Sequence, residues 1–371
     1  MLGCTTEDEG QAEIHWSQTI DEAGLFYLRA TPDTCDECIE VEEIARLGVG
    51  DGPGFLVETG YEFGIVVDHS DRYWVPQPAG AIQVYDATGA YLRSVGRAGQ
   101  GPFDFQRPWL SHVDPGGNVH VLDPANRRET LIDPDFELVE MRSLQDRFTR
   151  SASLGKGRYV IEAMLTTPAE IGFLLHIIGG GAVLRSFGVP LPLEGENAKP
   201  ITAFEQQRIL TIGPDGVIYS TKDHAYSIEA WDQDGNRLAG FEGPTLNETL
   251  PRAEPVSWDN PYVHRIRATR VDEQRRLWVA IHELRPDWKD LVEEVISAAG
   301  DVYVIPKDRT NWAVYRTRLD LVDLDAMTII ASRRVDGLLT TFLPGGRAAA
   351  VQYGADMNVQ IAIWRLAAPS N

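Results

Sequence analysis

The feature that most constrains the fold of this chain is a short phrase that recurs along most of its length. An apolar residue is followed by a turn rich in Gly, Pro and Asp, and then by an aromatic or aliphatic strand. Clear copies occupy residues 67–75, 113–121, 212–219 and 271–279, and weaker copies occupy residues 154–160 and 342–347. Self-similarity of this kind indicates a repeat architecture in which each copy belongs to one structural unit. Six copies predict six units.

A second phrase indicates what each unit contains. Residues 82–96 read as a strand, a tight turn and another strand that ends at glycine. The pattern returns around residues 133–136, 179–181, 232–235 and 323–325. Each unit is therefore expected to hold four short strands joined by turns. Antiparallel four-stranded units repeated every ~40 to 50 residues are typical of β-propellers, so we predict an all-β, six-bladed β-propeller.

The N-terminal part of the chain is expected to complete the sixth blade. After the last copy of the first phrase only three strands remain, near residues 338–342, 348–353 and 359–366. Residues 41–48 have the pattern of the missing outer strand, and adding them closes the ring and removes an open sheet edge. The predicted domains are a tether over residues 1–40 and a propeller over residues 41–371.

Two segments between these strands have a distinctive sequence. Residues 96–105 read Gly-Arg-Ala-Gly-Gln-Gly-Pro-Phe-Asp-Phe, and residues 121–128 read Val-Leu-Asp-Pro-Ala-Asn-Arg-Arg. Both resemble segments of the bacterial six-bladed β-propellers related to NHL repeats. The resemblance implies the fold for residues 41–367. It implies no single activity, because such propellers include protein-binding scaffolds, sensor domains, lactonases and lyases.

An insertion at residues 282–300 interrupts the fifth unit. Apolar residues at positions 288, 291, 292, 295 and 296 follow the spacing of one helix face, and Asp287 stands where an N-cap is expected. We therefore predict a helical insertion in blade five. Propeller topology places it on the face of the blade-to-blade linkers, where it either forms a lid or fills a groove between blades.

The charge and hydrophobicity of the chain exclude several classes of protein. The formal net charge is −21 and no long Lys/Arg cluster appears, which argues against binding to nucleic acid or to an anionic membrane surface. A hydrophobic content of 43% excludes global disorder. The longest uncharged apolar run, residues 171–184, is shorter than the ~20 residues of a membrane helix, so we expect no transmembrane span.

The three cysteines all lie near the N-terminus. Leu2-Gly3-Cys4 resembles the end of a bacterial lipobox, which implies lipidation of Cys4 and a lipoprotein of the bacterial cell envelope, periplasmic or anchored in the outer membrane. Cys35 and Cys38 are compatible with a redox pair, a metal pair or a disulfide. A zinc site needs a second pair and a redox motif needs a neighbouring βαβ unit, so the disulfide is the favoured prediction.

The candidate site is the mouth of the central channel, where the first strand of each blade begins. The position four residues before the start of the first phrase is expected there, and it is occupied by Phe63, Trp109, Arg150, Arg208 and Arg267. With Arg107 and Arg265 two positions earlier, the arginines would form a basic arc suited to a carboxylate or phosphate. Trp109 and Phe63 would form an apolar wall. The alternative is that these arginines only pair with local Asp and Glu residues.

Two enzymatic alternatives use the same mouth. Metal-dependent propeller lactonases hold a divalent ion with carboxylate and amide ligands, and Glu62 is the one acidic residue expected nearby. A zinc lyase would need converging histidines. His112 and His264 are the candidates for that role, whereas His69 is expected at the far end of its strand.

These observations favour a binding module without enzymatic activity and without a cofactor. We predict an envelope-associated monomer that binds an anionic small molecule or a protein partner at the channel mouth, binds no nucleic acid, and touches a membrane only through a lipid on Cys4. The first alternative is a metal-dependent hydrolase, lactonase or lyase. The second is an extrinsic subunit docked on a membrane complex.

Overall fold

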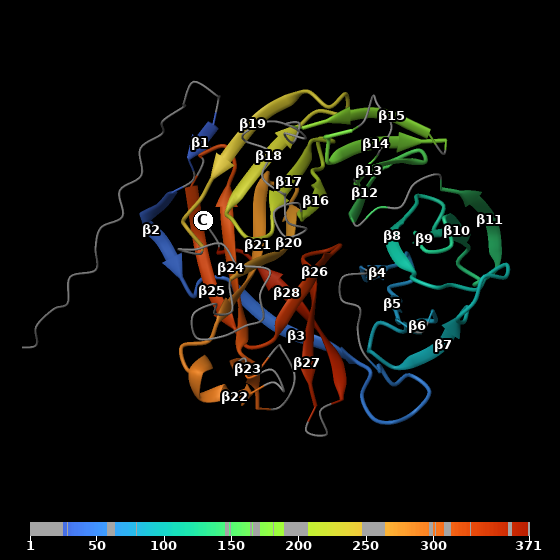
Figure 1. The fold of residues 1–371 in the computed structure, drawn as a ribbon, viewed down its shortest axis with the longest axis horizontal. Helices are drawn as coiled ribbons and strands as arrows, with labels where there is room; N and C mark the ends of the chain where they lie inside the picture. Colours follow the sequence, from blue (N-terminus) through green and yellow to red (C-terminus); the bar gives the residue numbers. More distant parts are fainter. Residues whose placement is uncertain are drawn as a thin grey trace, which may run out of the picture.

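The computed structural model describes residues 25–27, 29–57, 64–78, 80–144, 148, 150–163, 165, 171–180, 182–188, 207–246, 264–296, 300, 302–307, 313–326, 328–354 and 358–369. These residues form six mainly antiparallel β-sheets arranged around a central axis, and one separate two-stranded sheet (Figure 1). The prediction of an all-β, six-bladed propeller is therefore confirmed.

Blades one to three each consist of four consecutive strands, in order from the channel to the outer rim. Blade one contains β4 (Val66–Val67), β5 (Tyr73–Pro76), β6 (Ile82–Tyr85) and β7 (Tyr91–Val95). Blade two contains β8 (Trp109–Val113), β9 (Val119–Asp123), β10 (Arg128–Ile132) and β11 (Leu138–Ser143). Blade three contains β12 (Arg150–Gly155), β13 (Arg158–Glu162), β14 (Leu175–Gly179) and β15 (Ala182–Phe187).

Blades four to six each add one N-terminal strand to strands from later in the chain. Blade four contains β16 (Arg208–Ile212), β17 (Ile218–Lys222), β18 (Ser227–Trp231), β19 (Arg237–Glu242) and β1 (Leu25–Tyr27). Blade five contains β20 (Arg265–Val271), β21 (Arg276–Leu284), β24 (Tyr315–Asp323), β25 (Thr328–Val335) and β2 (Arg29–Asp36). Blade six contains β26 (Leu338–Leu343), β27 (Arg347–Tyr353), β28 (Val359–Ala367) and β3 (Glu40–Leu47).

The N-terminal strands follow the outer rim of three blades. β3 pairs antiparallel with β28, from Leu47 opposite Ile361 to Glu40 opposite Ala367, and so supplies the outer strand of blade six. The structure goes further than the sequence indicated, because β2 and β1 add parallel fifth strands to β25 and β19. Three otherwise open sheet edges are covered in this way.

An aspartate at the end of the inner strand explains why the first phrase recurs. The Asp68 carboxylate accepts hydrogen bonds from the backbone N–H groups of Ser70 (2.9 Å) and Arg72 (3.0 Å). It also accepts bonds from Arg72 Nε (2.6 Å) and Trp74 Nε1 (2.9 Å). Asp272 bonds the equivalent three residues of blade five in the same way. The aspartate therefore fixes the turn and anchors the tryptophan of the next strand.

The apolar core lies between neighbouring blades rather than inside any one of them. Trp74 and Val84 of blade one, for example, pack with Leu110 and Val121 of blade two. Leu47 of β3 is fully buried in the cluster that joins blade six to blade one. Each blade is therefore stabilised by burial against its neighbours, as expected of a closed ring.

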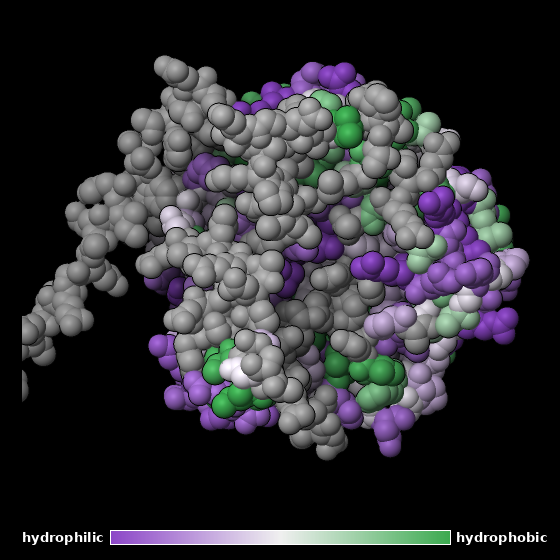
Figure 2. Space-filling view, viewed as in Figure 1, coloured by the Kyte–Doolittle hydropathy of each residue, from purple (hydrophilic) through white to green (hydrophobic). Residues whose placement is uncertain are grey.

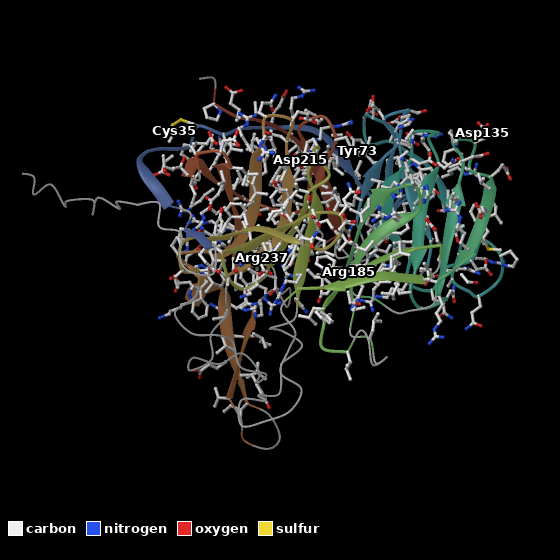
Figure 3. The ribbon with its side chains drawn as sticks, turned by 90° about the horizontal axis from the view of Figure 1, so that it is seen from above. Cys35, Tyr73, Asp135, Arg185, Asp215 and Arg237 are labelled. Atoms are coloured by element: carbon white, nitrogen blue, oxygen red, sulfur yellow. A yellow bond between two sulfur atoms is a disulfide. The ribbon has the colours of Figure 1, made fainter. Side chains whose placement is uncertain are left out.

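The prediction of a helix within residues 287–296 is wrong. A single 3₁₀ turn (Trp288–Leu291) leads into β22 (Val292–Ile296), which forms a hairpin with β23 (Val302–Pro306). The apolar residues of this segment are largely β-branched, and β-branched side chains favour strands. The hairpin projects from the face opposite the turns that carry Asp215 and Asp135 (Figure 3). It presents exposed Val295, Ile296 and Val302, a green patch in Figure 2.

No α-helix occurs in the described part of the chain. In the described residues, no helix has the length and apolar character needed to cross a bilayer.

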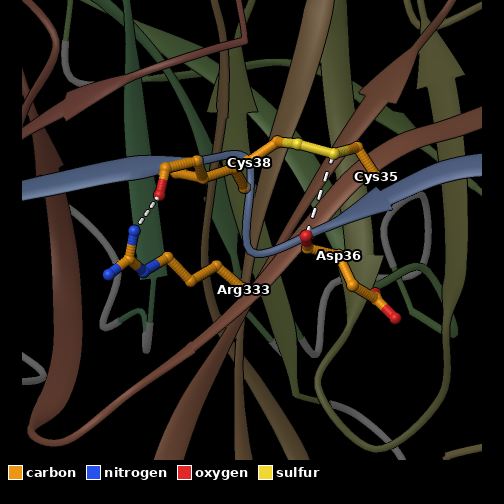
Figure 4. Close-up of a disulfide and its surroundings, with 5 residues drawn as sticks. Cys35, Asp36, Cys38 and Arg333 are labelled. Carbon is orange, nitrogen blue, oxygen red and sulfur yellow. Dashed lines mark hydrogen bonds between the residues drawn. A yellow bond between two sulfur atoms is a disulfide. The ribbon is translucent and has the colours of Figure 1, made fainter.

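Cys35 and Cys38 are joined by a disulfide in the bend between β2 and β3 (Figure 4). Their Cα atoms lie 5.6 Å apart, within the usual range for such a bond. The Arg333 guanidinium of β25 donates a hydrogen bond to the carbonyl oxygen of Ile39 (2.6 Å), which holds the start of β3 against blade five.

Candidate functional site

The inner strands of the six blades line a channel with a volume of about 620 Å³. One end of the channel, which we call the mouth, lies where the inner strands begin, on the side of the blade-to-blade linkers. The other end lies where β4 is followed by Asp68 and His69. The volume is within the range of small-molecule sites.

Three residues predicted for the mouth line the channel, namely Trp109, Arg150 and Arg267. The Arg150 guanidinium carbon lies 5.5 Å from the centre of the Trp109 ring, a cation–π contact between blades two and three. Arg267 occupies a β-bulge in the pairing of β20 with β21. Bulges change the direction of a side chain and are common beside functional sites. Phe63 lies outside the described residues.

The other predicted arginines lie outside this lining. Burial lowers the pKa of Arg208, whereas the carboxylates of Glu162, Glu229 and Asp223 act to raise it. Arg265 Nη1 lies 3.6 Å from Asp223 Oδ2. These two arginines therefore face carboxylates beside the mouth, as the local-pairing alternative expects.

Arg107 is exposed on the linker before blade two. Its backbone N–H donates to the Asp123 carboxylate (3.2 Å), a contact that holds the linker against blade two. The basic arc is thus divided, and only Arg150 and Arg267 among its members line the channel.

The channel is more positive than the rest of the molecule. Among the described lining residues the single carboxylate is Asp68, which is bonded to Arg72 and Trp74. Arg347 adds a further guanidinium at the far end, where its Nη1 bonds Asp71 (3.0 Å). Three arginines and one carboxylate therefore line a channel in a chain whose net charge is −21.

The sequence prediction missed two groups of channel residues. Arg347 comes from the second strand of blade six and holds the sixth position of the first phrase, where Arg72 and Arg276 stand without lining the channel. Serine and threonine residues of the inner strands, such as Ser111 and Thr340, also line the channel. The sequence contained a signal for Ser111 and Thr340, because both stand two positions before the start of the first phrase.

His112 lies on the wall between the channel and a second cavity of about 960 Å³ between blades two and three. Its ring stacks on that of His120, with 4.0 Å between centroids. His120 Nδ1 lies 2.6 Å from Glu129 Oε1, and the Tyr159 hydroxyl donates to the same oxygen. Burial, followed by the charge of His120, lowers the pKa of His112 to about 4.

The described residues form no cluster of metal ligands that would support the two enzymatic alternatives. His264 is half-buried at the start of β20, and burial lowers its pKa. Glu62 lies outside the described residues. Within the segments that the structure describes, no group of three or more His, Cys, Asp or Glu side chains is placed to hold a metal ion.

Comparison with known proteins gives the fold and no family. No protein-family model matches the chain. No curated protein sequence matches it either.

Solved structures do match. A protein from Bacteroides fragilis that is described as exported superposes with a TM-score of 0.56 at 12% identity, covering 91% of this chain and 98% of its own. A member of the DUF4221 family from Bacteroides vulgatus superposes with a TM-score of 0.54 at 8% identity, covering 89% and 99%. Virginiamycin B lyase from Staphylococcus aureus superposes less well, with a TM-score of 0.45 at 13% identity, covering 89% of this chain and 100% of its own. The first two similarities show that this chain shares its fold with proteins from two Bacteroides species.

Proposed function

We propose that this protein is an exported binding protein, without catalytic activity of its own, that takes an anionic small molecule at the mouth of its central channel. The positive charge of the channel is the observation that carries the proposal. A strongly acidic protein that lines one cavity with Arg150, Arg267 and Arg347 concentrates anions there against its overall field. Guanidinium groups bind carboxylates and phosphates through paired, charge-assisted hydrogen bonds.

Export to the cell envelope is part of the same proposal. Leu2-Gly3-Cys4 resembles a lipobox, although Cys4 lies outside the described residues, and the Cys35–Cys38 disulfide suits an oxidising compartment. A fold neighbour from Bacteroides fragilis is itself described as exported. Recovery of the native protein from the cytosolic fraction of its host would contradict this location.

Isothermal titration with citrate and with inorganic pyrophosphate tests the binding site. We expect the double variant Arg150→Gln/Arg267→Gln to bind these anions at least about tenfold more weakly than the wild type, because each substitution removes a charge-assisted contact. Arg365→Gln is the matched control, since Arg365 is an exposed arginine on β28 that pairs with Glu42 (2.7 Å) outside the channel. Thermal melting of each variant checks that the ring remains folded.

Three results would overturn the proposal. The first is that neither anion binds the wild type. The second is that the double variant binds both anions as tightly as the wild type does. The third is stoichiometric calcium or zinc in protein purified without chelators or metal-affinity resin, combined with turnover of a lactone or lyase substrate. The third result would restore the enzymatic alternative.

A further inference from the structure

Below the mouth, the channel wall combines apolar side chains with uncharged polar ones. Five of the six blades contribute a hydroxyl side chain from their inner strand to the lining. These are Ser111 of β8, Ser151 of β12, Thr211 of β16, Thr269 of β20 and Thr340 of β26. These hydroxyl side chains therefore lie along the channel between Arg150 and Arg267 at the mouth and Arg347 at the far end.

Two of these hydroxyl residues lie at β-bulges. The pairing of β8 with β9 shifts register around Ser111, and the pairing of β26 with β27 shifts around Thr340. The two residues hold the same repeat position, two before the start of the first phrase. A β-bulge redirects the side chain that it carries, and bulges cluster beside functional sites. Two blades thus use the same device to aim a hydroxyl, and blade five uses a bulge at Arg267.

Two other hydroxyls are buried without a partner. Thr269 is only 8% exposed, and within the described part of the chain neither its Oγ1 nor Ser151 Oγ has a hydrogen-bond partner. A buried hydroxyl left unsatisfied costs about 1–3 kcal/mol, which a ligand that bonds it in the channel would offset. Both oxygens are covered in this structure, so a ligand in the channel would reach them after rotation about χ1.

We infer that the anion taken by the channel is itself hydroxylated, a sugar acid of the uronic acid type, with its carboxylate at Arg150 and Arg267 and its hydroxyls against the Ser/Thr wall. This inference rests on the proposed function. A hydroxyl both donates and accepts, so a wall of hydroxyls suits a ligand that carries hydroxyls. Ser111 Oγ and Thr340 Oγ1 already have partners in the protein, but an apolar carboxylate would leave Ser151 and Thr269 unpaired. Sites built to bond a hydroxyl reject analogues that lack it.

Glucuronate and cyclohexanecarboxylate provide a direct comparison. Both are six-membered rings that carry one carboxylate, but only glucuronate carries ring hydroxyls. In isothermal titration we expect the wild type to bind glucuronate at least about tenfold more tightly. Thr269→Val should weaken glucuronate about tenfold and leave cyclohexanecarboxylate unchanged.

Thr130→Val is the matched control variant. Thr130 is fully buried on β10, its Oγ1 also has no hydrogen-bond partner in the described structure, and it does not line the channel. Its substitution should change neither affinity. Thermal melting separates a loss of binding from a loss of folding.

The possible outcomes distinguish this inference from the proposal beneath it. If both acids bind equally well, and both lose affinity in Arg150→Gln/Arg267→Gln, the hydroxylated ligand is wrong and the anion site stands. An equal effect of Thr269→Val on both acids also overturns the hydroxylated ligand. If neither acid binds, and citrate and pyrophosphate do not bind either, the proposed function fails together with this inference.

Discussion

Two histidines, His282 buried and His112 half-buried, link the stability of the ring to pH. His282 on β21 is 2% exposed, and its Nε2 lies 2.9 Å from the carbonyl oxygen of Leu339. Burial, followed by the charge of Arg267, lowers the pKa of His282 to about 3. The unfolded chain takes up this proton near pH 6.5. Stability contributed by the neutral histidine is therefore complete above pH 6.5 and is lost as the pH falls towards 3. His112 acts in the same direction, with a pKa of about 4.

Replacing His282 by Gln removes this titration and keeps a side-chain amide that can donate to Leu339. Between pH 7 and pH 5, the free energy of unfolding should fall by about 2 kcal/mol less in H282Q than in the wild type. Urea unfolding at the two pH values measures the difference. His69→Gln, at an exposed histidine in a turn, is the control and should match the wild type. An identical pH dependence for H282Q and the wild type would show that His282 does not titrate as inferred.

At the scale of the element, the hairpin β20–β21 depends on the turn that Asp272 fixes. The Asp272 carboxylate accepts hydrogen bonds from Arg276 Nε (2.9 Å) and from the buried Trp278 Nε1 (3.1 Å). Asp272→Ala leaves both donors without their acceptor at a buried place. We expect the free energy of unfolding to fall by about 2–4 kcal/mol, measured by urea unfolding followed through tryptophan fluorescence.

Asp86→Ala provides the comparison for this prediction. Asp86 accepts equivalent backbone bonds from Thr88 and Ala90 in the turn between β6 and β7, but it binds no buried side chain. Its substitution should destabilise the protein less than Asp272→Ala does. Equal losses in the two variants would mean that Arg276 and Trp278 add nothing beyond the turn itself.

At the scale of the whole molecule, β3 closes the ring between the first blade and the last. Deletion of residues 1–47 would expose the outer edges of β28, β25 and β19 and remove Leu47 from the core between blades six and one. We expect a lower melting temperature and association through the exposed edge. Calorimetry and size-exclusion chromatography with light scattering measure both.

A shorter deletion separates the effect of the three N-terminal strands from that of residues 1–24. Removing residues 1–24 keeps β1, β2 and β3 and should leave the melting temperature close to that of the whole chain. The two deletions are compared at the same protein concentration. A monomer lacking residues 1–47 that melts with the whole chain would show that β3 does not hold the ring together.

The blade pattern was readable because its chemistry is local. Asp68 bonds residues two, four and six positions further on, so the same short phrase can be recognised wherever it recurs. The insertion in blade five was misread for the opposite reason. Val292 pairs with Pro306, and a strand whose partner lies beyond the local window resembles a helix in its apolar spacing.

The sequence by itself determined the number of blades and the origin of the strand that closes the ring, because turn and strand signals act over a few residues. It also placed Trp109, Arg150 and Arg267 at the mouth, since repeat position sets depth along the channel. Only the tertiary structure decided which arginines face that channel. Glu162 from blade three approaches Arg208 of blade four, and no spacing in the chain encodes a carboxylate supplied by the neighbouring blade. The electrostatics of a channel depend on packing between blades, whereas the blades themselves depend on neighbours in sequence.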